Sequence, residues 1–490
     1  MENTIEIPLS PIDHAAPRHY CAFRFYLPLK PGVTPEAAFK VLHEGLHRTF
    51  TQLPWLSGQT WAQDATAKGY RPGQFVIRHH PVPISGPWPS QLRFHQANSG
   101  EATFDELREE GFPTDAFLDA FPAWSSSPPD VGKGPDVFKA VASFIPGGCI
   151  LLAGPQHLVC DGAAAMSIVN LWAEHCRAIQ LQSEVSVIAP APAASDRTLL
   201  AGARTKNSSD GVSPDPGAWR LFGRPGPPPP VSETEISRAP SGPETGITMK
   251  SAIFYLPADR FALLHKNCVE TDGAGVSATD ALSAWAWRCT LRARRNVALQ
   301  DGSTSSDVAK AESWAAVAIM LDGRGQLDSD LLLSGYLGNM TCVNLALMPL
   351  AQLTGPETGL GSIARLVRDG AAGVNPQTLM DAYALADALP DFDRLQHADM
   401  PLDGTALQIS PLLSLPTSGL DFGGQLFGNG GRPEALRPPM QWFNRSVRTC
   451  FFLPKLAGGG VEVVLNLFEK ELDALLQDPE FAEYAVHLAD

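Results

Sequence analysis

The chain has 490 residues, which is too long for one ordinary hydrophobic core and predicts two or more domains. Hydrophobic residues make up 44% of the chain and charged residues 18%, which excludes a disordered or coiled-coil protein. The 52 acidic and 37 basic residues give a formal net charge of −15, which is wrong for a protein that neutralises nucleic-acid phosphates.

The first part of the chain predicts strands and helices. Residues 21–29 (CAFRFYLPL) and 137–145 (VFKAVASFI) have the alternating pattern of strands. Residues 36–50 carry apolar side chains at helical spacing, and so do the residues that follow the segment QHLVCDG at 156–162. His157 in this segment is therefore expected at the end of a buried strand, just before a helix.

A segment rich in proline, glycine and serine, residues 181–247, separates two halves of similar size. It includes four consecutive prolines at 227–230, which favour an extended and semi-rigid connection. We interpret it as a crossover between an N-terminal lobe, residues 1–180, and a C-terminal lobe, residues 248–490. The predicted fold class is α/β, with two lobes of mixed sheet and helices.

Regular patterns resume in the second half. Residues 251–268 predict a strand followed by a helix, and residues 277–295 predict a long helix that Ser277 and Asp280 begin with capping-box spacing. The chain closes with a predicted strand, VEVVLNLF, and an amphipathic helix from Glu469.

The cysteines and the hydropathy indicate a reduced, soluble protein. None of the 8 cysteines is spaced as CxxC, which argues against a zinc ribbon or a disulfide framework. The start, MENTIEIPLSPID, lacks the features of a secretory signal, and no apolar run is long enough to span a membrane. We expect a cytoplasmic monomer without a membrane, nucleic-acid or obligate protein partner.

His157 and Asp161, four positions apart and followed by Gly162, are the first candidates for chemistry. A histidine in such a turn can act as a general base near neutral pH. A lone histidine is more often structural, and HxxxD occurs by chance in many proteins. The local sequence alone leaves both readings open.

Other motifs give weaker signals. His43, Glu44 and His47 match the HExxH zinc motif, but the third ligand is missing, so we reject a metal site. The segment GAGVSA at 273–278 lacks the preceding apolar strand of a dinucleotide fingerprint, although a helix N-terminus there can receive phosphate. No GxSxG motif occurs, which argues against a nucleophile-elbow hydrolase.

Two further clusters lie in the second half. Residues 415–431 place Asp421, Phe422 and Gly423 in a glycine-dense loop. Residues 321–339 combine an Asp-Gly-Arg segment, which contains Arg324, with the segment YLGN. Arg324 is a candidate partner for a buried carboxylate.

In this order, the motifs resemble the BAHD acyltransferase family, in particular its fungal secondary-metabolite branch. The resemblance covers nearly the whole chain: LSPID opens it, HLVCDG supplies HxxxDG, and DGR, YLGN and DFGGQ follow. It implies two lobes of the CoA-dependent acyltransferase fold, with the active site in a channel between them. The sequence departs from the family's DFGWG at Gly424 and Gln425, which puts the rigidity of that loop in doubt.

The resemblance also implies roles for individual residues. His157 is the expected base, and Asp161 holds the turn with Arg324 as its partner. Ser410 is the expected oxyanion-binding residue. The loop formed by Asp421, Phe422 and Gly423 is expected to shape the site without touching substrate.

The implied reaction transfers a short acyl group, most simply acetyl from acetyl-CoA, to a hydroxyl of a small fungal metabolite, with an amine less favoured. Acyl-CoA is a co-substrate, and neither a tightly bound cofactor nor a metal is expected. Because the protein is acidic, the CoA phosphates need a local cationic site. The candidates lie on the predicted helix 277–295, and they are Ser277, Thr279, Arg288, Arg292, Arg294 and Arg295.

Two alternatives stay open at this point. A condensation-domain relative would take its acyl group from a carrier protein, but such domains usually read HHxxxDG, and here Gln156 precedes His157. The fold can also be repurposed, for a cyclisation step or for binding alone.

Overall fold

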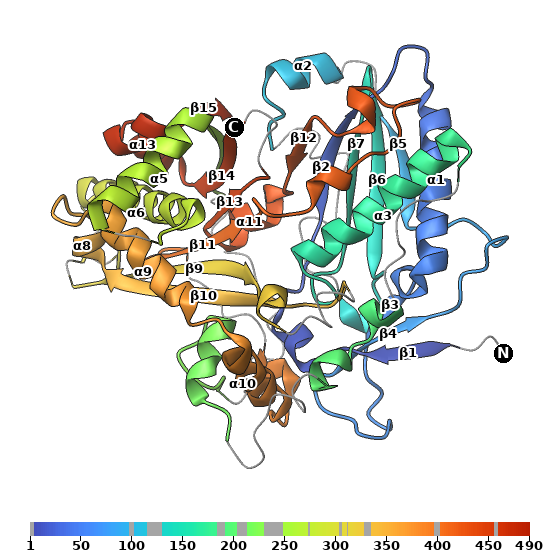
Figure 1. Ribbon diagram of the computed structural model, residues 1–490, viewed down its shortest axis with the longest axis horizontal. Coiled ribbons are helices and arrows are strands. Elements are labelled where there is room, and N and C mark those ends of the chain that lie inside the picture. The colour runs from blue at the N-terminus through green and yellow to red at the C-terminus, as the bar shows by residue number, and fades with distance from the viewer. Residues whose placement is uncertain are drawn as a thin grey trace.

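The computed structural model describes residues 4–97, 102–114, 130–183, 192–202, 213–229, 248–272, 275–302, 306–310, 312–327, 335–395, 402–454 and 459–490. They form two lobes that lie side by side, each built on a mixed sheet with helices packed against it (Figure 1). The predicted mixed α/β class with two lobes is therefore confirmed.

The N-terminal lobe contains a five-stranded sheet in the order β12-β2-β7-β6-β5. Its strands are β2 (Phe23–Pro28), β5 (Leu92–Gln96), β6 (Phe138–Ile145), β7 (Gly148–Pro155) and β12 (Ala435–Arg437). Two long helices, α1 (Pro35–Gln52) and α3 (Gly162–Leu181), pack against each other beside this sheet. A smaller sheet joins β1 (Ile5–Pro8), β4 (Phe75–His79) and β3 (Gln59–Ala62).

The C-terminal lobe is built on a seven-stranded sheet in the order β10-β9-β11-β13-β14-β8-β15. Its strands are β8 (Lys250–Leu256), β9 (Trp314–Asp322), β10 (Thr341–Pro349), β11 (Ala406–Pro411), β13 (Thr449–Phe452), β14 (Val461–Leu467) and β15 (Val486–Ala489). The helices of this lobe include α5 (Ala258–Asp272), α6 (Ala278–Gln300), α8 (Leu350–Thr354), α9 (Leu360–Ala372), α12 (Glu469–Leu476) and α13 (Pro479–Tyr484). Three more helices of the chain are α2 (Phe104–Glu109), α10 (Pro376–Asp387) and α11 (Met440–Ser446).

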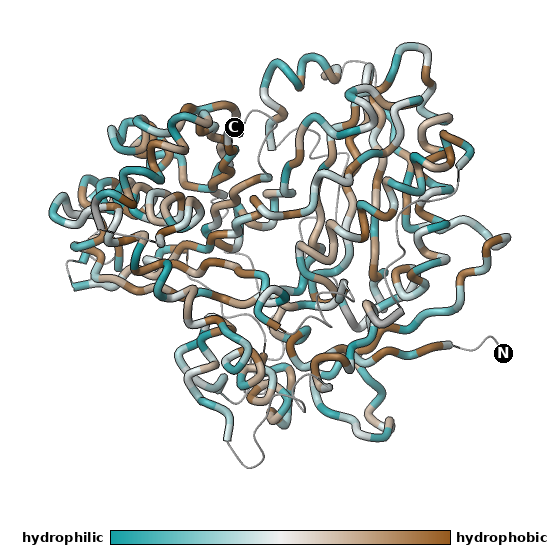
Figure 2. The backbone as a smooth tube through the Cα atoms, in the orientation of Figure 1, coloured by the Kyte–Doolittle hydropathy of each residue, from teal (hydrophilic) through white to brown (hydrophobic). Residues whose placement is uncertain are grey.

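Each lobe has its own hydrophobic core. Apolar segments follow the central strands and the inner faces of the helices (Figure 2). Trp172 on α3 is buried in the N-terminal core, while Trp285 and Trp287 on α6 are buried in the C-terminal core. Burying side chains of this size stabilises a fold by roughly 2–3 kcal/mol each. The helices predicted from apolar spacing thus form because one face of each covers a sheet.

Two features of the structure do not follow the division of the chain into an N-terminal and a C-terminal lobe. Strand β12 comes from the second half of the chain, yet it pairs antiparallel with β2 of the N-terminal sheet. Part of the crossover is packed rather than extended, because its 3-10 helix η6 (Pro216–Phe222) lies against α10 and buries Trp219. Of the proline run, 227–229 are described and Pro230 lies outside the described residues. The lobe boundaries 1–180, 181–247 and 248–490 stay a prediction.

Candidate active site

A cavity of about 510 Å³ lies at the junction of the two lobes. Residues from both halves of the chain line it, including the start of α3 on one side and β9, β10 and β11 on the other. The polar side chains of the lining are His19, Tyr20, His157, Asp161, Ser167, Asp322, Arg324, Tyr336, Asn339, Thr341, Gln408, Ser410 and Ser414. The volume is in the range of small-molecule sites, which combine an apolar wall with a few placed polar groups.

His157 lies in the connection between β7 and α3. Its backbone N–H donates to the carbonyl of His19 (2.7 Å), and the N–H groups of Val159 and Cys160 both donate to the carbonyl of Gln156 (2.9 and 3.1 Å). These bonds close a turn that presents the imidazole to the cavity, with Nδ1 buried on the protein side. Burial lowers the pKa of His157, against smaller opposing effects of its own carbonyl, the Asp161 charge and Asn339. The ring is therefore neutral at physiological pH, as a base must be.

Gln156, which precedes His157, has a structural role. Its side chain is buried and fully used: Oε1 accepts from Thr60 Oγ1 (2.9 Å), and Nε2 donates to the carbonyls of Pro135 and Asp136 (3.1 and 2.8 Å). Gln156 thus ties the end of β7 to the neighbouring segments and does not line the cavity.

Asp161 is the N-cap of α3, and its carboxylate bonds to residues of the C-terminal lobe. Its Oδ1 accepts from the Ala164 N–H and Arg324 Nη2 (both 3.0 Å), and its Oδ2 accepts from the Met340 N–H and Arg324 Nη1 (2.7 and 2.9 Å). Burial would raise the pKa of Asp161, but the Arg324 charge and these hydrogen bonds hold it below its usual value. The predicted pair of Asp161 and Arg324 is present in the structure and joins the two lobes.

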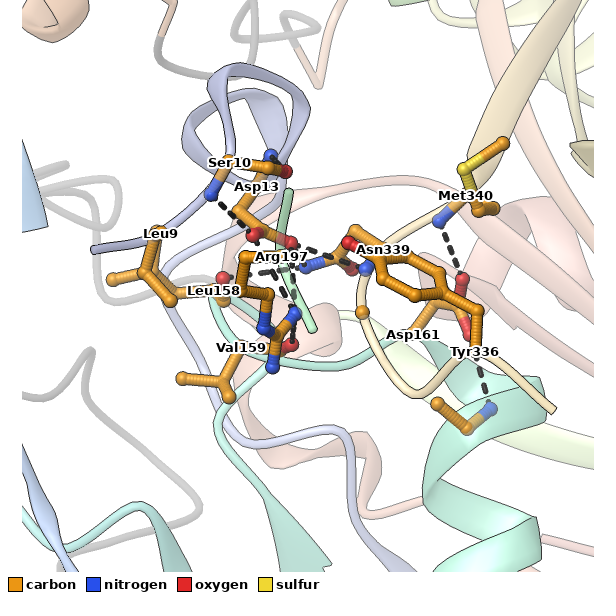
Figure 3. Close-up of polar contacts among 12 residues, drawn as sticks. Leu9, Ser10, Asp13, Leu158, Val159, Asp161, Arg197, Tyr336, Asn339 and Met340 are labelled. Atoms are coloured by element: carbon orange, nitrogen blue, oxygen red, sulfur yellow. Dashed lines mark hydrogen bonds and ion pairs between the residues drawn. The ribbon is translucent and has the colours of Figure 1, made fainter. Parts of the chain in front are cut away.

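A second buried cluster holds the same turn from the other side (Figure 3). Asp13 accepts from the backbone N–H and side-chain Nδ2 of Asn339 (3.1 and 2.9 Å) and forms an ion pair with Arg197 (3.4 Å). Asn339 Nδ2 also donates to the carbonyl of Leu158 (3.2 Å), and Arg197 Nη1 donates to that of Val159 (2.9 Å). Two consecutive carbonyls after His157 are therefore fixed by this cluster.

The sequence analysis missed this second cluster and its roles. LSPID and YLGN were noted as motifs, but nothing in them shows that Asp13 and Asn339 meet. Arg197 lies in the crossover, where the sequence has no regular pattern. The crossover also contains Arg204, Arg220, Arg224 and Arg238, so no signal in the sequence singles out Arg197.

Ser410 lies on the side of the cavity that the C-terminal lobe forms. It is buried near the end of β11, a central strand of the seven-stranded sheet, and it lines the cavity. Gln408, two positions earlier on the same strand face, lines the cavity as well. Leu412, just after this strand, also lines the cavity, whereas Leu413 packs against the core of the C-terminal lobe.

The loop of Asp421, Phe422 and Gly423 lies outside the cavity and packs on α3. Phe422 is fully buried, 6.0 Å from the ring of Trp172. At the end of α3, Gln180 Nε2 donates to the Phe422 carbonyl (2.5 Å), and its Oε1 accepts from the N–H groups of residues 425 and 426 (3.2 and 3.0 Å). Gln180 therefore fixes the loop although the tryptophan of DFGWG is absent.

A Cβ at position 424 would lie 3.3–3.5 Å from the backbone of Gly430, which requires a shift of at most a few tenths of an ångström. Gly423 and Gly431 have φ angles of 102° and 86°, which favour glycine. The glycine density of 415–431 thus reflects two backbone segments in close contact.

The structure does not bring the candidate phosphate-binding residues to the cavity. Ser277 caps α6 through a capping box with Asp280, and neither Thr279 nor Arg292 lines the cavity. Arg292 forms ion pairs with Asp478 and Glu480 (2.6 and 2.7 Å). The other arginines of α6 are also engaged, through contacts with Glu480, Leu353 and Thr358 for Arg288, Glu471 for Arg294 and Thr354 for Arg295.

The HExxH match has a structural explanation as well. His43 and His47 on α1 bond to the carbonyls of Pro89 and Ile84 (2.7 and 3.0 Å). Within the described ranges, no group of three or more His, Cys, Asp or Glu side chains is arranged to hold a metal ion.

His157 and Asp161, the N-cap of α3, lie at the junction of the two lobes. This is the architecture of a two-lobed acyltransferase. The model of the Transferase family matches residues 93–482, and the chain belongs to this family, the BAHD acyltransferases. The expected family is therefore confirmed. None of the helices in the described ranges combines the length and apolar character that a membrane span requires.

Several known proteins are similar to this chain. An isocyanide synthase-NRPS hybrid of Aspergillus fumigatus is 28% identical over 97% of the chain. The trichothecene 3-O-acetyltransferase of Fusarium sporotrichioides is 24% identical, over 91% of this chain and 89% of that protein. A solved structure of the F. graminearum counterpart, complexed with coenzyme A and deoxynivalenol, superposes with a TM-score of 0.76 at 18% identity and covers 99% of this chain and 100% of that one. The chain spans 31% of the length of the hybrid and 51% of that of another curated relative.

Proposed function

We propose that the protein transfers a short acyl group, acetyl in the simplest case, from an acyl-CoA thioester to a hydroxyl of a small fungal metabolite, with His157 as the general base. The observation that carries the proposal is the position of His157, whose backbone is fixed from both lobes and whose ring lines the cavity at their junction. The similarity to proteins named as O-acetyltransferases, and the coenzyme A in the related solved structure, support the donor.

In the proposed mechanism, His157 acts through Nε2. Its Nδ1 is buried on the protein side, so Nε2 is the nitrogen that can reach a substrate. Nε2 takes the proton of the acceptor hydroxyl as the oxygen attacks the thioester carbonyl, and it returns the proton to the leaving thiolate. Ser410, on the opposite lobe, donates a hydrogen bond to the carbonyl oxygen as negative charge develops there.

The cavity suits the reacting ends of the two substrates. Arg324 is the only lysine or arginine among its described lining residues, and Asp161 and Asp322 bind it. The CoA phosphates therefore lie outside this cavity, and only the thioester arm enters it. The apolar lining favours an acceptor with a hydrocarbon body.

The test combines a donor screen with two variants. Purified protein is supplied with acetyl-CoA and longer acyl-CoAs, and liberated thiol is measured. His157→Ala should lower kcat by about 10²–10⁴-fold, as the loss of a general base does. His43 lies on α1, and its ring bonds to the carbonyl of Pro89. The control variant His43→Ala should therefore keep wild-type turnover. Turnover of His157→Ala within a few-fold of wild type would remove the base assignment.

A carrier protein is the second candidate donor. The similarity to part of an NRPS hybrid favours it, because such assembly lines carry acyl groups as carrier-protein thioesters. Calorimetric titration with acetyl-CoA separates the two donors. Absence of acetyl-CoA binding, together with transfer from an acylated carrier protein, would establish the second candidate and remove the first.

A further inference from the structure

Several polar side chains that line the cavity are already bound to other parts of the protein. They include Tyr20, Asp161, Ser167, Asp322, Arg324 and Asn339. Gln408 on β11 differs from them. Its backbone N–H donates to the Arg448 carbonyl (3.0 Å), but its side-chain amide forms no hydrogen bond with any residue in the described ranges.

Strand β11 determines the face on which this amide lies. Leu407 and Ile409 are fully buried in the core of the C-terminal lobe. Because side chains alternate along a strand, Gln408 and Ser410 lie on the opposite face, and both line the cavity. Strands β9 and β13 pair with β11 on its two sides, so the backbone under Gln408 is held from both directions.

The neighbouring strands offer no partner for the amide. In register with Gln408 are Ala318 on β9, which has no polar group, and Thr449 on β13. The Thr449 hydroxyl is buried and has no hydrogen-bond partner, so it is not bound to Gln408 either. A carboxamide on the inner face of a sheet costs stability unless its donor and acceptor are satisfied. This placement is typical of a polar group that binds a ligand.

We propose that Gln408 is a substrate-binding residue that forms a hydrogen bond with a second polar group of the acceptor, remote from the hydroxyl that His157 deprotonates. This inference rests on the proposed function. Because a strand rises about 3.3 Å per residue, Gln408 lies about 6.6 Å along β11 from Ser410, the expected partner of the thioester oxygen. The methyl group of an acetyl donor has no polar atom for the amide, so the acceptor is the substrate that satisfies it.

The chemistry of the amide sets the class of acceptor. A carboxamide donates through Nε2 and accepts at Oε1, so either a hydroxyl or a carbonyl satisfies it, whereas a methyl group of similar size does not. Met320, Val343 and Phe451 give the cavity an apolar wall on β9, β10 and β13. The inferred acceptor therefore has a hydrocarbon body with polar groups at two separate positions, one that reacts and one that Gln408 binds.

The experiment measures competition between two acceptors, with acetyl-CoA as the donor. Both are derivatives of cyclohexanol: one carries a methyl group and the other a second hydroxyl, on the carbon opposite the reacting one. The ratio of products from an equimolar mixture gives the ratio of the two kcat/KM values. After correction for the two equivalent hydroxyls of the diol, wild type should favour the diol by about ten-fold, as one hydrogen bond provides.

Two variants carry the same substitution at different places. Gln408→Met replaces the amide by an apolar group of similar length and should reduce the ratio to about one. The control Gln96→Met changes an exposed glutamine on β5, outside the cavity lining, and should keep the wild-type ratio. Because each ratio is measured within one variant, general damage to the fold or to the base cancels.

The outcomes separate this inference from the proposed function. A wild-type ratio near one, or a ratio that Gln408→Met leaves unchanged, overturns the role of Gln408 while His157-dependent thiol release stands. A variant whose only change is a higher KM for acetyl-CoA would place the amide at the CoA arm, which also overturns this inference. Thiol release that does not depend on His157, or no transfer to either acceptor, overturns the proposed function and this inference with it.

Discussion

The pair of Asp161 and Arg324 should contribute more to stability than any exposed ion pair in the chain. We consider Asp161→Asn, Arg324→Met and the double variant. Each oxygen of the Asp161 carboxylate accepts from one backbone N–H and one guanidinium nitrogen. An asparagine therefore places its NH₂ group against two donors, whichever way the amide is turned. Asp161→Asn also leaves a buried guanidinium without its main counter-charge.

The structure sets the expected size of these effects. The side chains of Arg324 and Asp161 are 11% and 2% exposed, so each single change should cost about 3–5 kcal/mol in the free energy of unfolding. The double variant should cost less than the sum of the two, with a coupling of about 2–3 kcal/mol. Lys250 and Glu469 form a matched control: their atoms are closer, at 2.6 Å, but the side chains are 55% and 70% exposed. Their coupling should stay below about 1 kcal/mol.

Urea unfolding of both sets of four proteins measures these couplings. The pH dependence gives a second reading. Since the folded pKa of Asp161 lies below its unfolded value, its contribution is complete above about pH 4 and is lost as the pH falls through the folded pKa. Additive losses at Asp161 and Arg324, or a coupling no larger than that of the exposed pair, would refute the reasoning.

Three further predictions follow from the site. Arg197→Met should lower the free energy of unfolding by about 3–5 kcal/mol and lower kcat, because it leaves the Asp13 carboxylate buried without its counter-charge. Adding Asp13→Asn should recover part of this free energy, which urea unfolding measures. Gly162→Leu should lower kcat/KM for the acceptor by about ten-fold while the protein stays folded. The reason is that a Cβ at Gly162 meets no atom within 4 Å, so the leucine side chain extends into the cavity. Circular dichroism and steady-state kinetics test this, and unchanged kinetics would place Gly162 away from the substrate. In the pH profile of kcat/KM, the midpoint of the fall on the acid side should lie below the ordinary histidine pKa of about 6.5. The reason is that burial lowers the pKa of His157, so the base stays unprotonated to lower pH. A midpoint above that value would contradict His157 as the base.

Only the part of the candidate site that lies within one short segment could be predicted from local sequence patterns. His157 and Asp161 could be placed between a strand and a helix because a strand end, a turn and a helix start are encoded within a few residues, but their expected roles came from the family resemblance. Arg324 could be assigned only through the family resemblance, because its partner is 163 positions away. Asp13 and Arg197 are 184 positions apart, and no local pattern brings them together.

The same limit applies to the candidate phosphate-binding residues, which do not line the cavity. The positive charge of Arg292 was visible in the sequence, but the carboxylates of α13 that bind it lie 186 and more residues away. A charge on a helix therefore does not reveal whether it faces a ligand or another element of the protein.

The pairing of β12 with β2 has a consequence for how the chain can be divided. A fragment that ends in the crossover would lack β12, and β2 would then become an edge strand with unpaired backbone N–H and C=O groups along one side of an apolar sheet. Open edges of this kind recruit other chains and aggregate. During synthesis, the N-terminal sheet stays incomplete until Ala435–Arg437 have emerged, so the first half of the protein depends on the second for its solubility.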